Sequence, residues 1–357
     1  MEKSPNLRTG IGMASNVLVL GIETSCDETG LALVAEGRRL IAAQLASSLK
    51  EHQRYGGVVP EIASRAHVEL LTCELEALLA SARVGPSEID RIAVTVGPGL
   101  VGSLLVGVAA AKALGLAWGK RLVGVNHLHA HLYAALMEGS GFPIDAPMIG
   151  LIISGGHTAL VRMEGIRRCT LLGQTRDDAV GEAFDKVAKL LGLDFPGGPE
   201  IERVAKEGNP KVFRFSVPKM KSGSPYEFSL SGMKTAVLYK VREWQKGDSL
   251  SFTFVADMAA SFQASIVEEV VQKTITACRQ TRISRLVVGG GVVANQRLRD
   301  RLAQACTDFK IDLAIPSTEL CTDNGAMVAG LGAHLETWLP RELTAVPDLG
   351  VEGKGRE

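Results

Sequence analysis

Hydrophobic residues along the chain alternate between short apolar runs and longer mixed segments. Short runs rich in Val, Ile and Leu that end at Gly, Pro or polar residues predict strands, and longer segments with helical spacing predict helices. The predicted strands are 17–24, 31–35, 40–46, 91–96, 122–125, 148–153, 159–163, 286–288 and 313–315. The predicted helices are 58–82, 102–118, 127–137, 178–191, 252–280, 295–306 and 324–337. This order predicts an α/β fold with sheets that contain parallel strands and are flanked by helices.

Two segments of the chain share one pattern, strand, polar turn and strand. Residues 21–31 (GIETSCDETGL) and 150–160 (GLIISGGHTAL) carry Ser, Thr and Leu in register. Such a hairpin presents backbone N–H groups and hydroxyls to an anion such as a phosphate. Two copies predict a duplicated domain with a nucleotide between the halves.

The composition divides the chain into segments. Residues 1–16 are polar and without pattern, and we expect a disordered leader there. The first domain is expected over 17–138 and the second over 148–340, joined by a Gly- and Pro-rich linker at 139–147. Residues 341–357 are expected to form a flexible tail.

The pattern of the second half breaks between about 208 and 251, which we interpret as a basic insertion. Its basic residues include Lys211, Arg214, Lys219 and Lys221, with Phe213 and Phe215 between them. Because the formal net charge of the chain is zero, contact with a nucleic acid must come from such a local patch. A solvated basic loop is the alternative interpretation.

The remaining composition narrows the class of protein. A hydrophobic content of 46% and a charged content of 22% in 357 residues indicate two folded domains. The six cysteines are scattered without a C-x-x-C pair, and no signal peptide precedes the first strand. No apolar run reaches the ~18 residues that a membrane span needs. We therefore expect free thiols, a cytoplasmic location and no membrane contact.

A histidine pair is the strongest local signal for chemistry. His127 and His131 are four residues apart, so they share one face of a helix and suit one metal ion. Asp323 is the candidate for a third, anionic ligand, although the sequence alone favours a helix N-cap at that position. Leu128 stands where a metalloprotease of the H-E-x-x-H type has its glutamate, which disfavours that class.

Glycine-rich turns and carboxylates supply candidates for substrate binding. The turn from Ser154 through Gly155 and Gly156 to His157 suits a phosphate, and a plain hairpin turn is the alternative. Residues 289–291, which precede Asn295, and the Gly197–Gly198 pair suit the close approach of a purine or ribose.

Three acidic residues are further candidates. Asp185, in a predicted helix, suits ribose hydroxyls if it faces a cleft, and a solvated helix face is the alternative. Asp27 and Glu28 in the first turn are candidate acids, or residues of an Asx-type turn.

Taken together in chain order, these strings resemble the bacterial TsaD family, the tRNA threonylcarbamoyladenosine-modifying subunit. The resemblance covers 17–337. The strings that carry it are GIETSCDET, NHLHAH, SGGHT, GEAFDK, PGGP, FSLSGMKT, GGGVVAN and TDNGAM.

The resemblance implies two actin-like (ASKHA, ribonuclease H-like) domains with the active site in the cleft between them. It implies transfer of a threonylcarbamoyl group from threonylcarbamoyl-adenylate to the N6 amine of adenosine 37, in tRNAs that read codons starting with A. It also implies tRNA, a TsaB-type paralogue and a TsaE-type ATPase as partners.

The same resemblance assigns roles to residues. His127, His131 and Asp323 match metal ligands, with Fe(2+) usual and Zn(2+) possible. Asp27 and Glu28 match the acids near the reacting group. The positions that match adenylate contacts are Ile153, Ser154, Gly155, Gly156, His157, Asp185, Gly198, Glu202 and Asn295. One departure is Ile152, where archaeal relatives have a tyrosine ligand, so substrate, water or Asp27 must complete the metal shell.

Two other functions remain as alternatives at this stage. A metalloendopeptidase needs a water-activating glutamate on the helix face of His127 and His131. A non-catalytic ASKHA regulator that binds a nucleotide and a partner predicts loss of the metal ligands, yet all three positions are filled.

Overall fold

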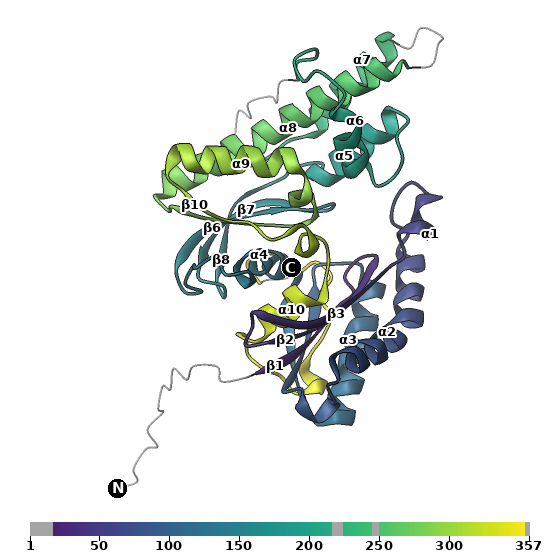
Figure 1. Cartoon of the computed structure of the whole chain (residues 1–357), viewed down its shortest axis with the longest axis vertical. Helices are drawn as coiled ribbons and strands as arrows, with labels where there is room; N and C mark the ends of the chain where they lie inside the picture. The colour runs from purple at the N-terminus through teal and green to yellow at the C-terminus, as the bar shows by residue number, and fades with distance from the viewer. Residues whose placement is uncertain (1–16, 216–223, 245–249, 354–357) are drawn as a thin grey trace.

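The computed structural model describes residues 17–215, 224–244 and 250–353, and its two lobes each contain one five-stranded sheet (Figure 1). The first sheet consists of β1 (Leu18–Glu23), β2 (Glu28–Ala35), β3 (Arg39–Ser47), β4 (Arg91–Gly97) and β5 (Arg121–Asn126). The second consists of β6 (Pro147–Ile153), β7 (Thr158–Glu164), β8 (Cys169–Gln174), β9 (Arg285–Gly289) and β10 (Asp312–Ala314).

The two sheets have the same topology. The strand order is β3-β2-β1-β4-β5 in the first and, read from the other edge, β8-β7-β6-β9-β10 in the second. In each, the first three strands in sequence pair antiparallel and the last two add in parallel. The predicted α/β fold is confirmed, and both expected hairpins form, β1–β2 and β6–β7.

Ten helices are described, and most of them cover the outer faces of the sheets. They are α1 (Leu49–Gln53), α2 (Pro60–Ala82), α3 (Val101–Trp118), α4 (His127–Met137), α5 (Val180–Leu190), α6 (Gly197–Ala205), α7 (Ser231–Trp244), α8 (Phe252–Thr281), α9 (Gln296–Phe309) and α10 (Gly325–Gly332). Helices α2 and α3 bury the outer core of the first sheet, whereas α5 to α9 bury that of the second. Local chemistry fits the helix starts: Pro60 opens α2, where its missing N–H costs nothing, and the Ser251 hydroxyl caps α8.

Two helices lie between the lobes and cross over. Helix α4 follows the first sheet but packs on β9 and β6 of the second, and α10 follows the second sheet but packs on β1 and β2 of the first. Small residues allow this close approach, because a Cβ on Gly21 would lie 2.2 Å from the Gly325 carbonyl oxygen. The expected second domain, 148–340, therefore contains a helix that covers the first sheet.

The end of the chain differs from the expected arrangement. Helix α10 ends at Gly332 rather than 337, because Trp338 pairs its backbone with Leu122 of β5. Residues 341–353, expected to be flexible, run across both lobes. Val346 bonds to the Val96 carbonyl, and Glu352 accepts a hydrogen bond from the Leu171 backbone N–H. We refer to 341–353 as the C-terminal strap.

The expected insertion is in part ordinary core. Helix α7 lies within it and buries Met233, Val237 and Val241. Phe213 is not free to stack on bases, because its ring packs against Phe254. The expected leader 1–16 and the basic positions Lys219 and Lys221 lie outside the described residues.

Helix α3 differs from the expectation that no segment is apolar enough for a membrane. By length and composition it is such a segment, with a mean hydropathy of 1.7. One face of it, which includes Leu104, Val108 and Ala111, is buried within the first lobe. A core helix with this composition is weak evidence for a membrane span.

Candidate functional site

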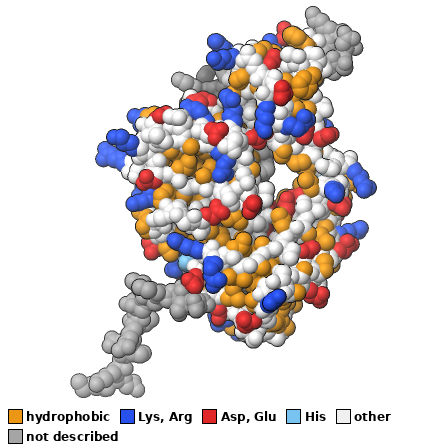
Figure 2. Space-filling view, viewed as in Figure 1, with side chains coloured by type: hydrophobic (Ala, Val, Ile, Leu, Met, Phe, Trp, Pro, Cys, Tyr) orange, Lys and Arg blue, Asp and Glu red, His pale blue; other side chains and the backbone are white. Residues whose placement is uncertain are grey.

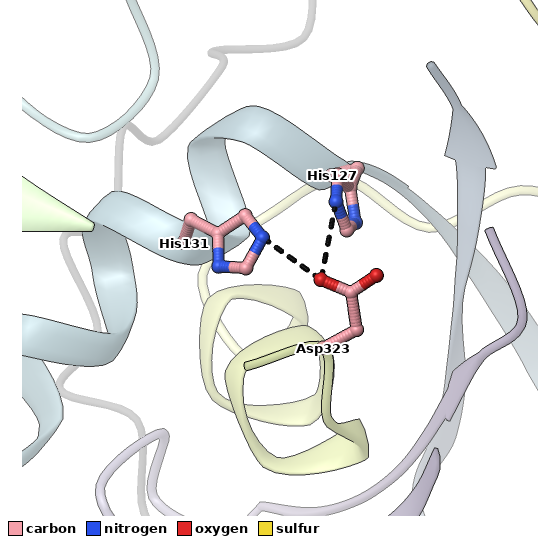
Figure 3. Close-up of side chains that lie close together, drawn as sticks. All are labelled: His127, His131 and Asp323. Carbon is pink, nitrogen blue, oxygen red and sulfur yellow. Dashed lines mark ion pairs between the residues drawn. The ribbon is translucent and has the colours of Figure 1, made fainter. Parts of the chain in front are cut away.

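Three of the predicted residues meet between the lobes (Figure 3). His127 and His131 lie on one face of α4, and Asp323 directly precedes α10. The Asp323 Oδ1 atom is 3.1 Å from His131 Nε2 and 3.5 Å from His127 Nε2. One ligand atom from each of the three lies within 4.8 Å of the others. The crossing of α4 and α10 therefore builds the site from both halves.

Asp323 is not the helix cap that its position also suggested. The cap of α10 is Asn324, whose Oδ1 accepts the Met327 backbone N–H at 2.9 Å. The carboxylate of Asp323 is thus free to face the histidines. The N-cap interpretation of Asp323 is wrong, and the ligand interpretation agrees with the geometry.

The chemistry of this cluster fits a divalent cation. His131 is fully buried, and neither of its ring nitrogens has a hydrogen-bond partner among the described residues. Burial alone would raise the pKa of Asp323, but the charges of His127 and His131 outweigh it and lower that pKa. Two imidazoles and one carboxylate are a donor set that zinc and iron accept. The structure therefore contains a possible metal site.

One residue that the sequence analysis missed supports the cluster from behind. Glu23, at the end of β1, is completely buried, and its Oε2 is 3.1 Å from His127 Nδ1. Burial alone would lower the pKa of His127, but the carboxylates of Asp323 and Glu23 raise it to about 9. A carboxylate at an otherwise apolar strand end was the available signal in the sequence.

The two candidate acids lie beside the cluster in the turn between β1 and β2. Asp27 is buried, and Glu28 is the first residue of β2. Burial, and then the charges of Asp323 and Asp27, raise the pKa of Glu28 to about 10. The side chains of Asp27 and Glu28 also share a hydrogen bond. Glu28 therefore carries a proton at neutral pH, and Asp27 can accept its hydrogen bond.

A pocket of about 190 Å³ in the second lobe brings together five of the predicted substrate residues. They are Gly155, Asp185, Gly198, Glu202 and Asn295. Phe184, Pro196 and Val292 give the pocket apolar walls. Figure 2 shows the surface hollowed between the lobes, on the side where α1 reaches towards α5 and α6.

The polar side chains of this pocket are already held in place. Asp185 accepts the Gly197 backbone N–H at 2.7 Å, and burial raises the pKa of its carboxyl group. Glu202 accepts the backbone N–H of Gln296 at 2.8 Å. Asn295, which also lines the pocket, caps α9 through its Oδ1 atom, which accepts the Leu298 backbone N–H at 3.0 Å. These contacts fix the orientation of the three side chains.

The turn between β6 and β7 connects the pocket to the metal cluster. Its Gly155 lines the pocket, and both Gly155 and Gly156 are exposed. Burial, together with the positive charges of His127 and His131, lowers the pKa of His157 to about 4. His157 therefore lies near the cluster and is neutral at physiological pH.

Two of the predicted substrate residues in this turn contribute differently from Gly155. The Ser154 hydroxyl accepts the His157 backbone N–H at 3.1 Å, which stabilises the turn. The Ile153 side chain is fully buried in the core, so only its backbone can face a ligand.

Comparison with known proteins identifies the family. The sequence profile of TsaD, described as tRNA N6-adenosine threonylcarbamoyltransferase, matches residues 39–330. A protein of that name from Anaeromyxobacter dehalogenans strain 2CP-1 is 49% identical over 337 residues, which cover 94% of this chain and 98% of the relative. One from Desulfitobacterium hafniense strain Y51 is 47% identical over 340 residues, with 94% and 98% covered.

The chain belongs to the TsaD family. It is therefore a transferase of tRNA modification, and the predicted activity, tRNA threonylcarbamoylation, is confirmed. No comparison favours a metalloendopeptidase or a non-catalytic regulator.

Solved structures of low sequence identity share the fold. Full-length HypF in its phosphate- and nucleotide-bound form aligns with a TM-score of 0.56 at 15% identity, over 89% of this chain and 46% of that one. Component A of (R)-2-hydroxyglutaryl-CoA dehydratase from Acidaminococcus fermentans aligns with a TM-score of 0.52 at 12% identity, over 89% and 98%. Together with the family and the duplicated topology, these alignments agree with the predicted pair of actin-like domains.

Proposed function

We propose that this TsaD chain takes the threonylcarbamoyl group from threonylcarbamoyl-adenylate and transfers it to the N6 amine of adenosine 37 in tRNAs that read codons starting with A. One observation supports this most strongly: a single turn, 154–157, borders both the pocket and the metal cluster. A substrate with a nucleotide at one end and a reactive carbonyl at the other fits such a two-part site.

The pocket would hold the adenylate end of this substrate. Its apolar walls suit a purine, and the carboxylates of Asp185 and Glu202 suit the ribose hydroxyls. The backbone N–H groups of the exposed Gly155 and Gly156 would then face the phosphate. The turn would thereby place the carbamoyl carbon toward the histidines.

The metal cluster would hold one divalent cation, for which we propose Fe(2+), with Zn(2+) as the alternative. His127, His131 and Asp323 would be its ligands. When bound, the cation supplies a Lewis acid for the oxygens of the carbamoyl or carboxylate group. Ile152 is fully buried and offers no ligand atom, which leaves part of the shell to substrate, water or Asp27.

In the transfer step, the adenosine amine attacks the carbamoyl carbon. The new N–C bond forms, the bond from that carbon to the phosphate oxygen breaks, and adenylate leaves with the electron pair. The amine must lose one proton. Since Glu28 is already protonated at neutral pH, we assign this proton to Asp27 and a hydrogen-bond donor role to Glu28.

Transfer of labelled threonine to tRNA tests this function. The chain is combined with the TsaB-type and TsaE-type subunits that the resemblance implies, with ATP, tRNA and threonylcarbamoyl-adenylate labelled in its threonine part, and label in tRNA is counted. We expect His131→Ala to lose this transfer and bound metal while circular dichroism stays that of the wild type. A tRNA with guanosine at position 37 should accept no label.

A matched control lies on the same helix. His129 points away from the cluster, and its Nε2 donates to the Val351 carbonyl at 2.6 Å. His129→Gln keeps a donor there, so transfer should continue. Wild-type transfer by metal-depleted His131→Ala would reject the proposed role of the cluster.

The exposed face of α2 and α3 is our proposed contact for the TsaB-type paralogue. Val68 of α2 and Leu105 and Leu116 of α3 are more than half exposed, which is unusual for three large apolar residues on neighbouring helices. Leu105→Glu should abolish co-elution with the paralogue, and Leu105→Ala should weaken it.

The same proposal includes a cytoplasmic location, since all six cysteines are free thiols.

A further inference from the structure

Glu23 carries a carboxylate that is completely enclosed by the protein. Its side chain is fully buried, and both oxygens are used. Oε1 accepts the Ser25 backbone N–H at 2.6 Å, and Oε2 accepts the Thr95 hydroxyl at 2.6 Å and lies 3.1 Å from His127 Nδ1. A buried charge is expensive unless it is paired in this way, so these partners are needed for Glu23 to remain ionised.

Two groups lie 3.1 Å from His127 Nδ1, Glu23 Oε2 and the Ser25 hydroxyl, and of these the carboxylate determines which ring nitrogen carries hydrogen, because a hydroxyl can donate as well as accept. An ionised carboxylate only accepts, so the Nδ1 atom of His127 must carry the proton of this hydrogen bond. The other nitrogen, Nε2, faces Asp323 and the interior of the cluster. In the neutral ring, the lone pair is then on Nε2, where a cation needs it.

The second histidine has no comparable support. Nδ1 of His131 has no hydrogen-bond partner in the described parts of the chain. Its Nε2 lies 3.1 Å from Asp323 Oδ1, on the side of the cluster, and buried apolar residues of α4 and its neighbours pack around the ring. Hydrogen bonding therefore orients one of the two imidazoles, and Glu23 is the carboxylate that does it.

Glu23 also reaches the turn with the candidate acids. Its Oε1 atom holds the backbone of Ser25, two residues before Asp27. The same carboxylate thus joins the turn of Asp27 and Glu28 to a ligand of the cluster. A shift of the turn would therefore move His127, and a shift of His127 would move the turn.

We propose that Glu23 is a positioning residue that fixes His127 in its Nδ1–H form and presents Nε2 to the divalent cation, while fastening the turn of Asp27 to the same ligand. The metal part of this inference rests on the proposed function, and the tautomer part concerns the protein alone. Outer partners of this kind typically strengthen metal binding about 10- to 100-fold.

The test uses the full chain and two measurements. The first is the affinity for Zn2+ alone by chelator competition. We expect Glu23→Gln to weaken it about 10- to 100-fold and Glu23→Asp to recover part of the loss. Thr95→Val is the matched control, because it removes a partner of Oε2 but keeps the carboxylate. It should weaken the affinity for Zn2+ clearly less than Glu23→Gln does. Zn2+ affinity of Glu23→Gln within twofold of the wild type, with an unchanged fold by circular dichroism, would overturn the metal part.

The second measurement is the 15N NMR spectrum of His127 in metal-free protein at about pH 10.5, because the pKa of His127 is about 9 and only the neutral ring has distinct tautomers. We expect a fixed Nδ1–H form in the wild type and a mixture of tautomers in Glu23→Gln. A fixed Nδ1–H form in both would overturn the tautomer part, whether or not metal binds. Unchanged Zn2+ affinity in His131→Ala would instead count against the cluster as the metal site, so the two failures are distinguishable.

Discussion

The first and second hairpin turns have the same place in a duplicated topology but opposite surroundings. In the first turn, Leu100 donates to the Ser25 carbonyl at 2.8 Å and His67 to the Cys26 carbonyl at 3.0 Å. The second turn bonds to the start of α5 and leaves Gly155 and Gly156 exposed beside the pocket. One copy of the motif is therefore enclosed by its own chain, and the other remains open for a ligand.

This difference explains how one repeated unit serves two purposes. The enclosed turn holds the candidate acids rigidly and fastens them to a metal ligand through Glu23. The open turn keeps backbone groups for the substrate. The duplicated topology gives both turns the same place in their sheets, and the contacts around each turn determine its role.

Gly97, at the end of β4 and enclosed by the C-terminal strap, should give the largest effect in the comparison of the enclosed and the open part of the molecule. A Cβ on Gly97 would lie 1.9 Å from the Val346 carbonyl oxygen, and its φ of 154° disfavours other residues. Gly97→Ala should therefore lower stability by about 3 kcal/mol. The midpoint of thermal unfolding should fall by at least about 6 °C. An unchanged midpoint would show that the C-terminal strap is not packed as described.

Glycine in the second turn should respond differently. A Cβ on Gly155 meets no atom within 4 Å, so Gly155→Ala should unfold at the wild-type temperature. The added methyl would occupy the pocket, and we expect the affinity for a non-hydrolysable adenylate analogue to fall about tenfold, or ~1.4 kcal/mol. Calorimetric titration measures this directly. Reduced stability with normal affinity would reverse the assignment of the two turns.

The pH dependence of stability sharpens the comparison, because only the first turn encloses a neutral acid. The pKa of Glu28 is about 10 in the folded chain against an ordinary 4.5. Its contribution to stability is therefore fully present below about pH 4.5 and is lost progressively as the pH rises toward 10. The Glu28→Gln variant has no carboxyl group to ionise at this position, so its stability does not fall in the same way as the pH rises. Its unfolding midpoint should lie roughly 2–4 °C above that of the wild type at pH 8.5.

The same pair of proteins provides the control for this pH effect. At about pH 4, below the ordinary pKa of 4.5, most Glu28 side chains of the wild type are protonated in both the folded and the unfolded state, so the two unfolding midpoints should nearly coincide. A constant difference from about pH 4 to 8.5 would show that burial of Glu28 does not set its pKa.

Binding of tRNA should give the smallest effect, because each phosphate contact contributes little. Lys211 and Arg214 are exposed basic residues of the second half without a described ion pair. Reversing both charges should reduce the slope of log affinity against log salt by about 1.5–2. Arg83→Glu at the end of α2 is the matched control in the first half. Equal slopes for all three proteins would place the tRNA surface elsewhere.

The sequence was informative wherever the signal is local. Helical spacing identified His127 and His131, and the repeated hairpin pattern identified the duplication. The strings around Asp185, Gly198 and Asn295 pointed to residues that the fold does gather in one pocket. Each of these signals depends on residues a few positions apart.

Features that depend on distant contacts were missed. Periodicity shows that α10 has an apolar surface but not which sheet it covers, and the crossing depends on Gly21 of β1 and Gly30 of β2 meeting Gly325 of α10. The apolar residues of the C-terminal strap follow neither helical nor strand spacing, and its order comes from burial of Leu343 and Val351 and from the backbone bond of Val346 to Val96. Glu23 gains its role from Thr95 and His127, which lie 72 and 104 positions away.

The crossing of α10 has a consequence for the way the chain is made. During synthesis β1 and β2 leave the ribosome long before the helix that covers them, residues 325–332. Asp323 emerges with that helix. At about 5–20 residues per second, the first sheet waits some tens of seconds with one apolar face uncovered. We expect nascent chains released before residue 325 to bind chaperones through that face, and the active site to form only once residues 323–332 have emerged.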